Sequence, residues 1–129
     1  MTIRHNCETH GCYIKKMTPN WGFLDSSFSK RITVGDIDGI VEANGKLLIL
    51  EWKTSGAEIP LGQQIMFEKV TPISGIVTVI VIWGDPEETT VSGYQLFFNG
   101  KKQKKKEAGC DDIKEVCRRW EFWARGSKC

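Results

Sequence analysis

The sequence predicts an α/β fold in which a central mixed β-sheet is flanked by helices. Strand-like apolar runs occupy residues 37–43, 47–53, 76–82 and 91–98. Helix signals occupy residues 60–70, between two of these runs, and residues 111–125, after the last of them. A chain that combines strands and helices in this order buries its core between a sheet and the helices that cover it.

The chain has the size of one compact domain. It has 129 residues, of which 40% are hydrophobic and five are tryptophan. This is enough apolar material for a packed core and excludes a disordered chain. We find no internal repeat and no linker, so we expect a single domain over residues 1–129. The net charge is only +2, so any contact with nucleic acid requires a local basic patch.

No segment predicts a membrane span or a signal peptide. The first seven residues have no apolar run behind their basic residue, and the most apolar segment, residues 73–83, is too short to cross a bilayer. Five cysteines are an odd number, which argues against a disulfide framework. We therefore expect a cytoplasmic protein.

The first half of the chain predicts a hairpin. Spaced aromatic residues at 21–28 indicate a short helix or a packed loop, and residues 32–34 are strand-like. Asn44-Gly45 joins two apolar runs, which is the strongest short-range signal for a two-residue turn. The second run is apolar on both faces until Glu51, so we expect an inner strand that is covered on both sides.

The second half predicts a helix, two strands and a final helix. Pro60 suits the first turn of the helix that runs to Val70. Gly84-Asp85-Pro86 ends the next strand and Asn99-Gly100 the one after it. Acidic residues at 111–112 favour a helix N-terminus. The apolar stripe of that last helix consists of Ile113, Val116, Cys117, Trp120, Trp123 and Ala124, and we expect Phe122 to be core as well.

The hairpin predicts two opposed carboxylates. If the turn has two residues, counting back along both strands places Asp38 directly across from Glu51, on the same face. Directly opposed residues have Cβ atoms about 4.5–5.5 Å apart. Two carboxylates at this distance repel each other unless a cation lies between them. A divalent cation with oxygen ligands at about 2.0–2.6 Å meets this need.

Lys53 lies two residues beyond Glu51 and therefore shares its face. A lysine there can position an attacking water or neutralise charge on a phosphate, so the whole set suits phosphodiester hydrolysis. Asp36 falls across from Lys53. It is either an ion-pair partner or, if a β-bulge shifts the register by two residues, the metal ligand in place of Asp38. The alternative is a surface ion pair between Asp36 and Lys53, with Asp38 as a turn residue.

Asp38, followed thirteen residues later by Glu51-Trp52-Lys53, resembles the signature of the PD-(D/E)XK nuclease superfamily. By order of elements the resemblance covers residues 31–83. It implies a restriction-endonuclease-like fold and DNA as the partner. It also implies Asp38, Glu51 and the Trp52 carbonyl as ligands of Mg²⁺ or Mn²⁺, and Lys53 as the catalytic lysine.

A second part of the resemblance lies in the helix that follows. Gln63, with Phe67 four residues later, is similar to the Gln-x-x-x-Tyr motif of exonuclease-like members. The phenylalanine lacks the tyrosine hydroxyl, so no exonuclease subtype follows. The proline of the family name is also missing. Many members use a further acid from an N-terminal helix, for which Glu8 and Asp25 are equal candidates.

The expected function is that of a small Mg²⁺-dependent DNA nuclease, phage-encoded or bacterial, acting inside the host cell. A homodimer would let one site per chain cut both strands. Two alternatives from other classes remain: a non-catalytic DNA-binding module on the same fold, and an interaction domain stabilised by zinc.

The zinc alternative rests on the N-terminus. Four potential ligands lie within eight residues: His5, Cys7, His10 and Cys12. The spacing of Cys7 and Cys12 is close to that of a zinc knuckle, and Cys110 and Cys117 are candidates to complete a site. The alternative is that these are ordinary thiols, and the place of Cys117 on the apolar stripe favours core packing.

A basic run precedes the last helix. Five of six consecutive residues are lysine: Lys101, Lys102, Lys104, Lys105 and Lys106. They can contact DNA phosphates, which would give salt-dependent binding without sequence preference. The alternative is a solvated hairpin or loop.

Overall fold

The computed structural model describes residues 20–29, 32, 35–72 and 75–126. The chain divides into two units, Met1–Asp36 and Ile37–Cys129, and each is described by itself. In the first unit, η1 (Trp21–Ser27) is a 3-10 helix, in agreement with the expected short helix. The Asn20 side chain accepts a hydrogen bond from the Gly22 N–H at 2.8 Å and so caps the first turn. Ile32 lies outside any strand, and its two strand-like neighbours fall outside the described residues.

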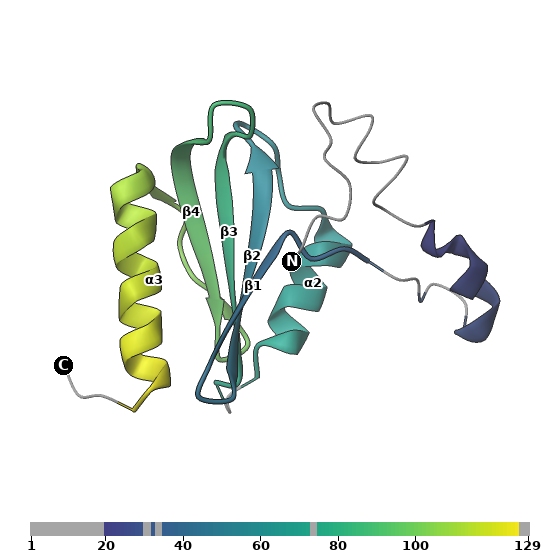
Figure 1. Ribbon diagram of the computed structural model, residues 1–129. Helices are drawn as coiled ribbons and strands as arrows, with labels where there is room; N and C mark the ends of the chain where they lie inside the picture. Colours follow the sequence, from purple (N-terminus) through teal and green to yellow (C-terminus); the bar gives the residue numbers. More distant parts are fainter. Residues whose placement is uncertain (1–19, 30–31, 33–34, 73–74, 127–129) are drawn as a thin grey trace, which may run out of the picture. The chain divides into compact units, whose positions relative to one another are not determined.

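Within the described residues, the second unit is built on a six-stranded mixed sheet (Figure 1). The strands are β1 (Gly39–Ala43), β2 (Lys46–Thr54), β3 (Val77–Asp85), β4 (Thr90–Phe98), β5 (Lys101–Lys102) and β6 (Lys106–Glu107). They lie in this order from β1 to β5, and β6 pairs with β4 as β5 does. The pair β2–β3 is parallel and the other pairs are antiparallel. The predicted α/β class with a mixed sheet is therefore confirmed.

Asn44-Gly45 forms the predicted two-residue turn. Both residues have positive φ, 53° and 79°, as the favoured hairpin turn requires. The pairing runs from Ala43–Lys46 back to Gly39–Leu50, in the predicted register. The ladder ends there, so β1 begins two residues later than predicted and Asp38 lies just outside it.

Two helices cover opposite faces of the sheet (Figure 1). Helix α2 (Leu61–Val70) contributes Phe67 to a cluster with Val79, Val81, Trp83 and Phe97. Helix α3 (Cys110–Ala124) contributes Trp120 and Ala124 to a cluster with Leu48, Ile80 and Ile82. Since successive strand residues point to opposite faces, β3 is buried on both sides. We call these two sides of the sheet the α2 face and the α3 face.

The predicted apolar stripe of α3 is confirmed except at Trp123, and the expectation that Phe122 is a core residue is wrong. Trp120 and Ala124 are buried, whereas Phe122 and Trp123 are each 38% exposed. Phe122 lies two residues from Trp120, which in a helix of 3.6 residues per turn places it on the far side. Trp123 packs edge-on against Phe98 at a centroid distance of 5.2 Å, at the margin of the sheet. No helix in the described ranges is long and apolar enough to cross a membrane.

Candidate functional site

Glu51 is a buried acid on the inner strand β2. It lies on the α2 face, because its neighbours Leu50 and Trp52 pack on the α3 face. It is only 9% exposed. The Gln63 amide donates a hydrogen bond from Nε2 to Glu51 Oε1 at 3.0 Å, and Lys53 Nζ lies 3.6 Å from the same oxygen. The structure therefore brings together three of the residues predicted from the sequence.

The connection from β2 to α2 positions Gln63 above the strand. Gly56 has a φ of 83°, which a glycine adopts without strain. The Ala57 N–H bonds to the Thr54 carbonyl at 3.0 Å, and the Gln64 N–H to the Pro60 carbonyl at 2.9 Å starts the helix. The first turn of α2 thus lies over the carboxyl end of β2, which runs parallel to β3. Ligand sites of α/β proteins commonly form at this end of parallel strands.

Asp38 is exposed and lies one residue before β1. Its Oδ2 accepts a hydrogen bond from the Trp52 N–H at 2.8 Å, so a side chain continues the β1–β2 pairing where the ladder ends. Its negative charge raises the pKa of Glu51, so the two carboxylates lie close enough to repel. The role of the Trp52 carbonyl as a metal ligand stays a prediction.

The pKa of Glu51 is raised above its ordinary value of 4.5, chiefly because burial penalises the charged form and secondly because Asp38 is negative. The hydrogen bond from Gln63 and the positive charge of Lys53 act in the opposite direction and do not compensate. A second positive charge at this position would stabilise the ionised form of Glu51.

The residues at this position fit a hard divalent cation. Gln63 Oε1 is buried and has no hydrogen-bond partner in the part of the chain that the structure describes. With the carboxylates of Asp38 and Glu51 it makes an all-oxygen set of potential ligands, which Mg²⁺ and Mn²⁺ prefer. Among the described residues, no three His, Cys, Asp or Glu side chains lie together so that they could hold a metal ion. Two carboxylates suffice for Mg²⁺, because it usually keeps several waters.

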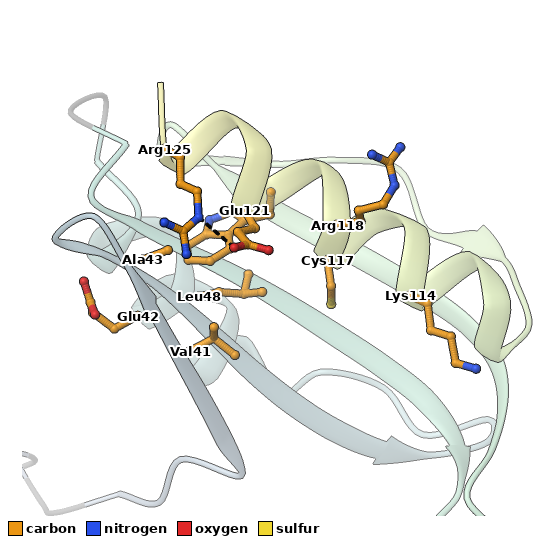
Figure 2. Close-up of a pocket in the computed structure, with 10 residues that line it drawn as sticks. Val41, Glu42, Ala43, Leu48, Lys114, Cys117, Arg118, Glu121 and Arg125 are labelled. Carbon is orange, nitrogen blue, oxygen red and sulfur yellow. Dashed lines mark hydrogen bonds and ion pairs between the residues drawn. The ribbon is translucent and has the colours of Figure 1, made fainter. Parts of the chain in front are cut away.

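A cavity of about 390 Å³ lies on the other side of the sheet, between α3 and the β1–β2 hairpin (Figure 2). Leu48 and Cys117 line it, and the ion pair of Arg125 with Glu121, 2.7 Å long, lies beside it. Because Glu51 lies on the α2 face, this cavity is separate from the candidate site. Burial raises the pKa of the Cys117 thiol, which agrees with core packing.

The five lysines of the basic run lie along one edge of the sheet, with Lys104 and Lys105 in the segment between β5 and β6. Lys101 and Lys102 make up β5, Lys106 begins β6, and all five lysines are exposed. Because β5 follows β4 through the Asn99-Gly100 turn and the lysines are exposed, the structure agrees with the alternative of a solvated hairpin. Contact with DNA stays a prediction. Lys105 Nζ lies 3.9 Å from the centroid of the Trp83 ring, which belongs to the α2 face. No motif in the sequence indicated this contact.

Several predicted residues cannot be placed against this site. Glu8, Cys7 and Cys12 fall outside the described residues, and Asp25 and Asp36 belong to the first unit. The zinc site, the third acid and the pairing of Asp36 with Lys53 stay predictions. So does a single domain over residues 1–129.

We expect the metal-free protein to be destabilised by ionisation of Glu51. Because the pKa is raised in the folded state, the folded chain binds the proton more tightly than the unfolded chain. The resulting cost is absent below about pH 4.5 and grows as pH rises through the folded-state pKa. In EDTA, Glu51→Gln should therefore melt at a higher temperature than the wild type at about pH 8, with a smaller gap at about pH 5.

The matched control is Glu88→Gln, which removes an exposed carboxylate from the turn after β3. Its melting temperature should follow the wild type at both pH values. A Glu51→Gln protein that is less stable than the wild type at high pH would contradict the electrostatic account.

Comparisons of the chain with models of protein families, with curated proteins and with solved structures found no match. A functional assignment therefore rests on the residues and geometry of the site.

Proposed function

We propose that this protein is a metal-dependent DNA nuclease with a restriction-endonuclease-like fold. The observation that carries the proposal is the buried carboxylate of Glu51, which has Lys53 and Gln63 on one oxygen and the charge of Asp38 nearby. Burying an acid beside another acid is costly. A cation site for phosphodiester hydrolysis accounts for all four residues.

The reaction is the hydrolysis of a phosphodiester. The oxygen of a water bonds to phosphorus, the bond from phosphorus to one sugar oxygen breaks, the water loses a proton and the leaving oxygen gains one. Asp38 and Glu51 would hold Mg²⁺ or Mn²⁺, which when bound activates the water and offsets phosphate charge. The ammonium of Lys53 stabilises the charge that develops on the phosphate. Gln63 holds Glu51 in place through the 3.0 Å hydrogen bond.

DNA as the substrate is supported by the lysine edge of the sheet. Lys105 lies on the α2 face, as Glu51 does. A polyanion that reaches an acidic centre needs positive charge beside it. Lysines on an edge strand also hinder pairing between molecules, so their charge alone does not identify DNA. The combination with the acidic site favours a nuclease.

The test is cleavage of labelled linear duplex, single-stranded, supercoiled and branched DNA by the wild type. We expect cleavage with Mg²⁺ or Mn²⁺ and none with EDTA. Independently of activity, Mg²⁺ at about 100 times its dissociation constant should stabilise the fold by about 2.7 kcal/mol. Thermal melting measures this, and the shift should be lost in Glu51→Gln.

Three results would contradict the proposal. The first is the absence of a Mg²⁺- or Mn²⁺-dependent melting shift in the wild type. The second is cleavage that continues in EDTA, and the third is failure of the wild type to cleave any of these DNAs with either metal. DNA binding without metal, together with the first result, would favour the alternative of a non-catalytic DNA-binding module.

A further inference from the structure

The outer edge of the sheet contains an extra residue, and it changes the direction of Lys105. Two residues separate Tyr94 from Phe97 on β4, but three separate their partners Lys106 and Lys102 on the edge. Lys102 shares the α2 face with Phe97, since opposed residues share a face. Strict alternation from Lys102 would place Lys105 on the α3 face. The bulge places it on the α2 face instead, over Trp83.

The residues next to Lys105 leave room for its side chain. Gly93 lies opposite Trp83, and a methyl group on Gly93 would lie 2.9 Å from the Lys106 carbonyl oxygen and 3.6 Å from Lys105 Cε. The absence of a side chain at this position leaves the space that the edge strand and the lysine occupy. Trp83 is itself fixed, because its indole N–H donates to the Ala57 carbonyl at 2.6 Å.

A cavity of about 310 Å³ lies between this lysine and the start of α2. Trp83, Gln64, Gln95 and Lys105 line it, together with residues 57–59. Gln64 follows Gln63 in the chain, and Trp83 is the register partner of Lys53 on the adjacent strand. Adjacent strands lie about 4.8 Å apart, so the cavity is a direct neighbour of the candidate active site.

We propose that this cavity binds one unpaired nucleotide of the DNA strand, next to the phosphate that is cleaved. The inference rests on the proposed function, because it takes the ligand to be DNA. An indole, two amides and an ammonium are the groups that such a nucleotide needs. Aromatic rings and amides recognise a base, and the ammonium of Lys105 binds a phosphate.

The bonds within the cavity leave these groups available to a base. Gln95 donates one amide N–H to the Gln103 carbonyl at 2.7 Å, and Gln64 donates one to the Glu68 carboxylate at 3.2 Å. Each amide has a second N–H and a carbonyl oxygen that can bond to a base edge. The contact of an exposed ammonium with an indole is weak, so Lys105 can exchange it for a phosphate.

The size of the cavity suits a single nucleotide. Its volume of about 310 Å³ is at the lower end for a small-molecule site. A base inside a duplex would have to leave its stack to enter. The preferred substrate is therefore single-stranded or branched DNA with an unpaired nucleotide at the cut.

The test measures DNA binding by fluorescence anisotropy with the full chain carrying Glu51→Gln, which should bind without cutting. The probes are a labelled single strand, its duplex, and a strand of the same length with abasic nucleotides. We expect the single strand to bind more tightly than the duplex. Adding Lys105→Ala should weaken single-strand binding at least about fivefold. Lys106→Ala, which removes the same charge from the α3 face, should weaken it no more than about twofold.

The base contact is tested by Gln64→Ala, which should weaken binding of the normal strand but leave binding of the abasic strand unchanged. Melting curves establish that each variant is folded. The inference is overturned if the normal and abasic strands bind equally, if the duplex binds as tightly as the single strand, or if Lys105→Ala and Lys106→Ala have equal effects. Cleavage by the wild type together with any of these results would contradict the nucleotide site alone. Failure of the wild type to cleave would contradict the nuclease, and the binding data would still decide the nucleotide site.

Discussion

Glu51→Gln is expected to reduce metal-dependent DNA cleavage by about 10²–10³-fold, the effect of losing electrostatic stabilisation of the transition state, here by the cation that Glu51 would hold. The substitution keeps the shape of the side chain, and its oxygen can still accept the hydrogen bond from the Gln63 amide. It removes the negative charge that would hold the cation. The measurement is the single-turnover cleavage rate of a labelled DNA in Mg²⁺, with DNA binding measured in parallel.

The loss of activity should be accompanied by a gain of stability in the metal-free protein. Burial and the charge of Asp38 raise the pKa of Glu51, so the ionised side chain destabilises the fold that contains it. A structural carboxylate would differ in its effect on stability, since its removal would lower stability as well as activity. Cleavage by Glu51→Gln above about one tenth of the wild-type rate would be incompatible with a transition-state role of this size.

The hairpin and its register could be predicted because they depend on neighbouring residues. Asn44-Gly45 is itself the turn signal, and once the turn is fixed, the alternation of β-strands places Glu51 and Lys53 on one face. The inner position of β2 followed from its apolar run in the same way. The approach of Gln63 to Glu51 was suggested by the motif resemblance and not by strand geometry.

The features that escaped prediction depend on distant parts of the chain. Trp83 and Lys105 are brought together by the pairing of the sheet edge with β4 and by one extra residue in that edge. A bulge of this kind has no turn signal of its own. Asp38 also departs from the predicted pattern, since it holds the Trp52 N–H with its side chain outside the ladder. Tertiary pairing decided the position of Lys105, and the early end of the β1–β2 ladder decided that of Asp38.

Lys53→Ala is expected to reduce cleavage by about 10²–10³-fold, the effect of removing one preorganised positive group beside the reacting phosphate. DNA binding should change much less, because the lysine edge of the sheet remains. The ammonium of Lys53 lies 3.6 Å from Glu51 Oε1 and lowers the pKa of that carboxyl. Without it, Glu51 requires a higher pH to ionise. The loss should therefore be largest at low pH and smaller as the pH rises.

Lys53→Arg separates the two roles of the lysine. It keeps the positive charge, so the pH profile should return toward that of the wild type, while the rate stays reduced because a guanidinium does not reproduce the position of an ammonium. Lys69→Ala, in the last turn of α2 and exposed, is the control and should cleave as the wild type does. Equal losses at all pH values in Lys53→Ala would show that Lys53 acts on the phosphate without affecting the ionisation of Glu51. If Lys53→Ala cleaves DNA at the wild-type rate, Lys53 is not a catalytic residue. Asp38, Glu51 and Gln63 would then form a cation site without a group that stabilises the phosphate.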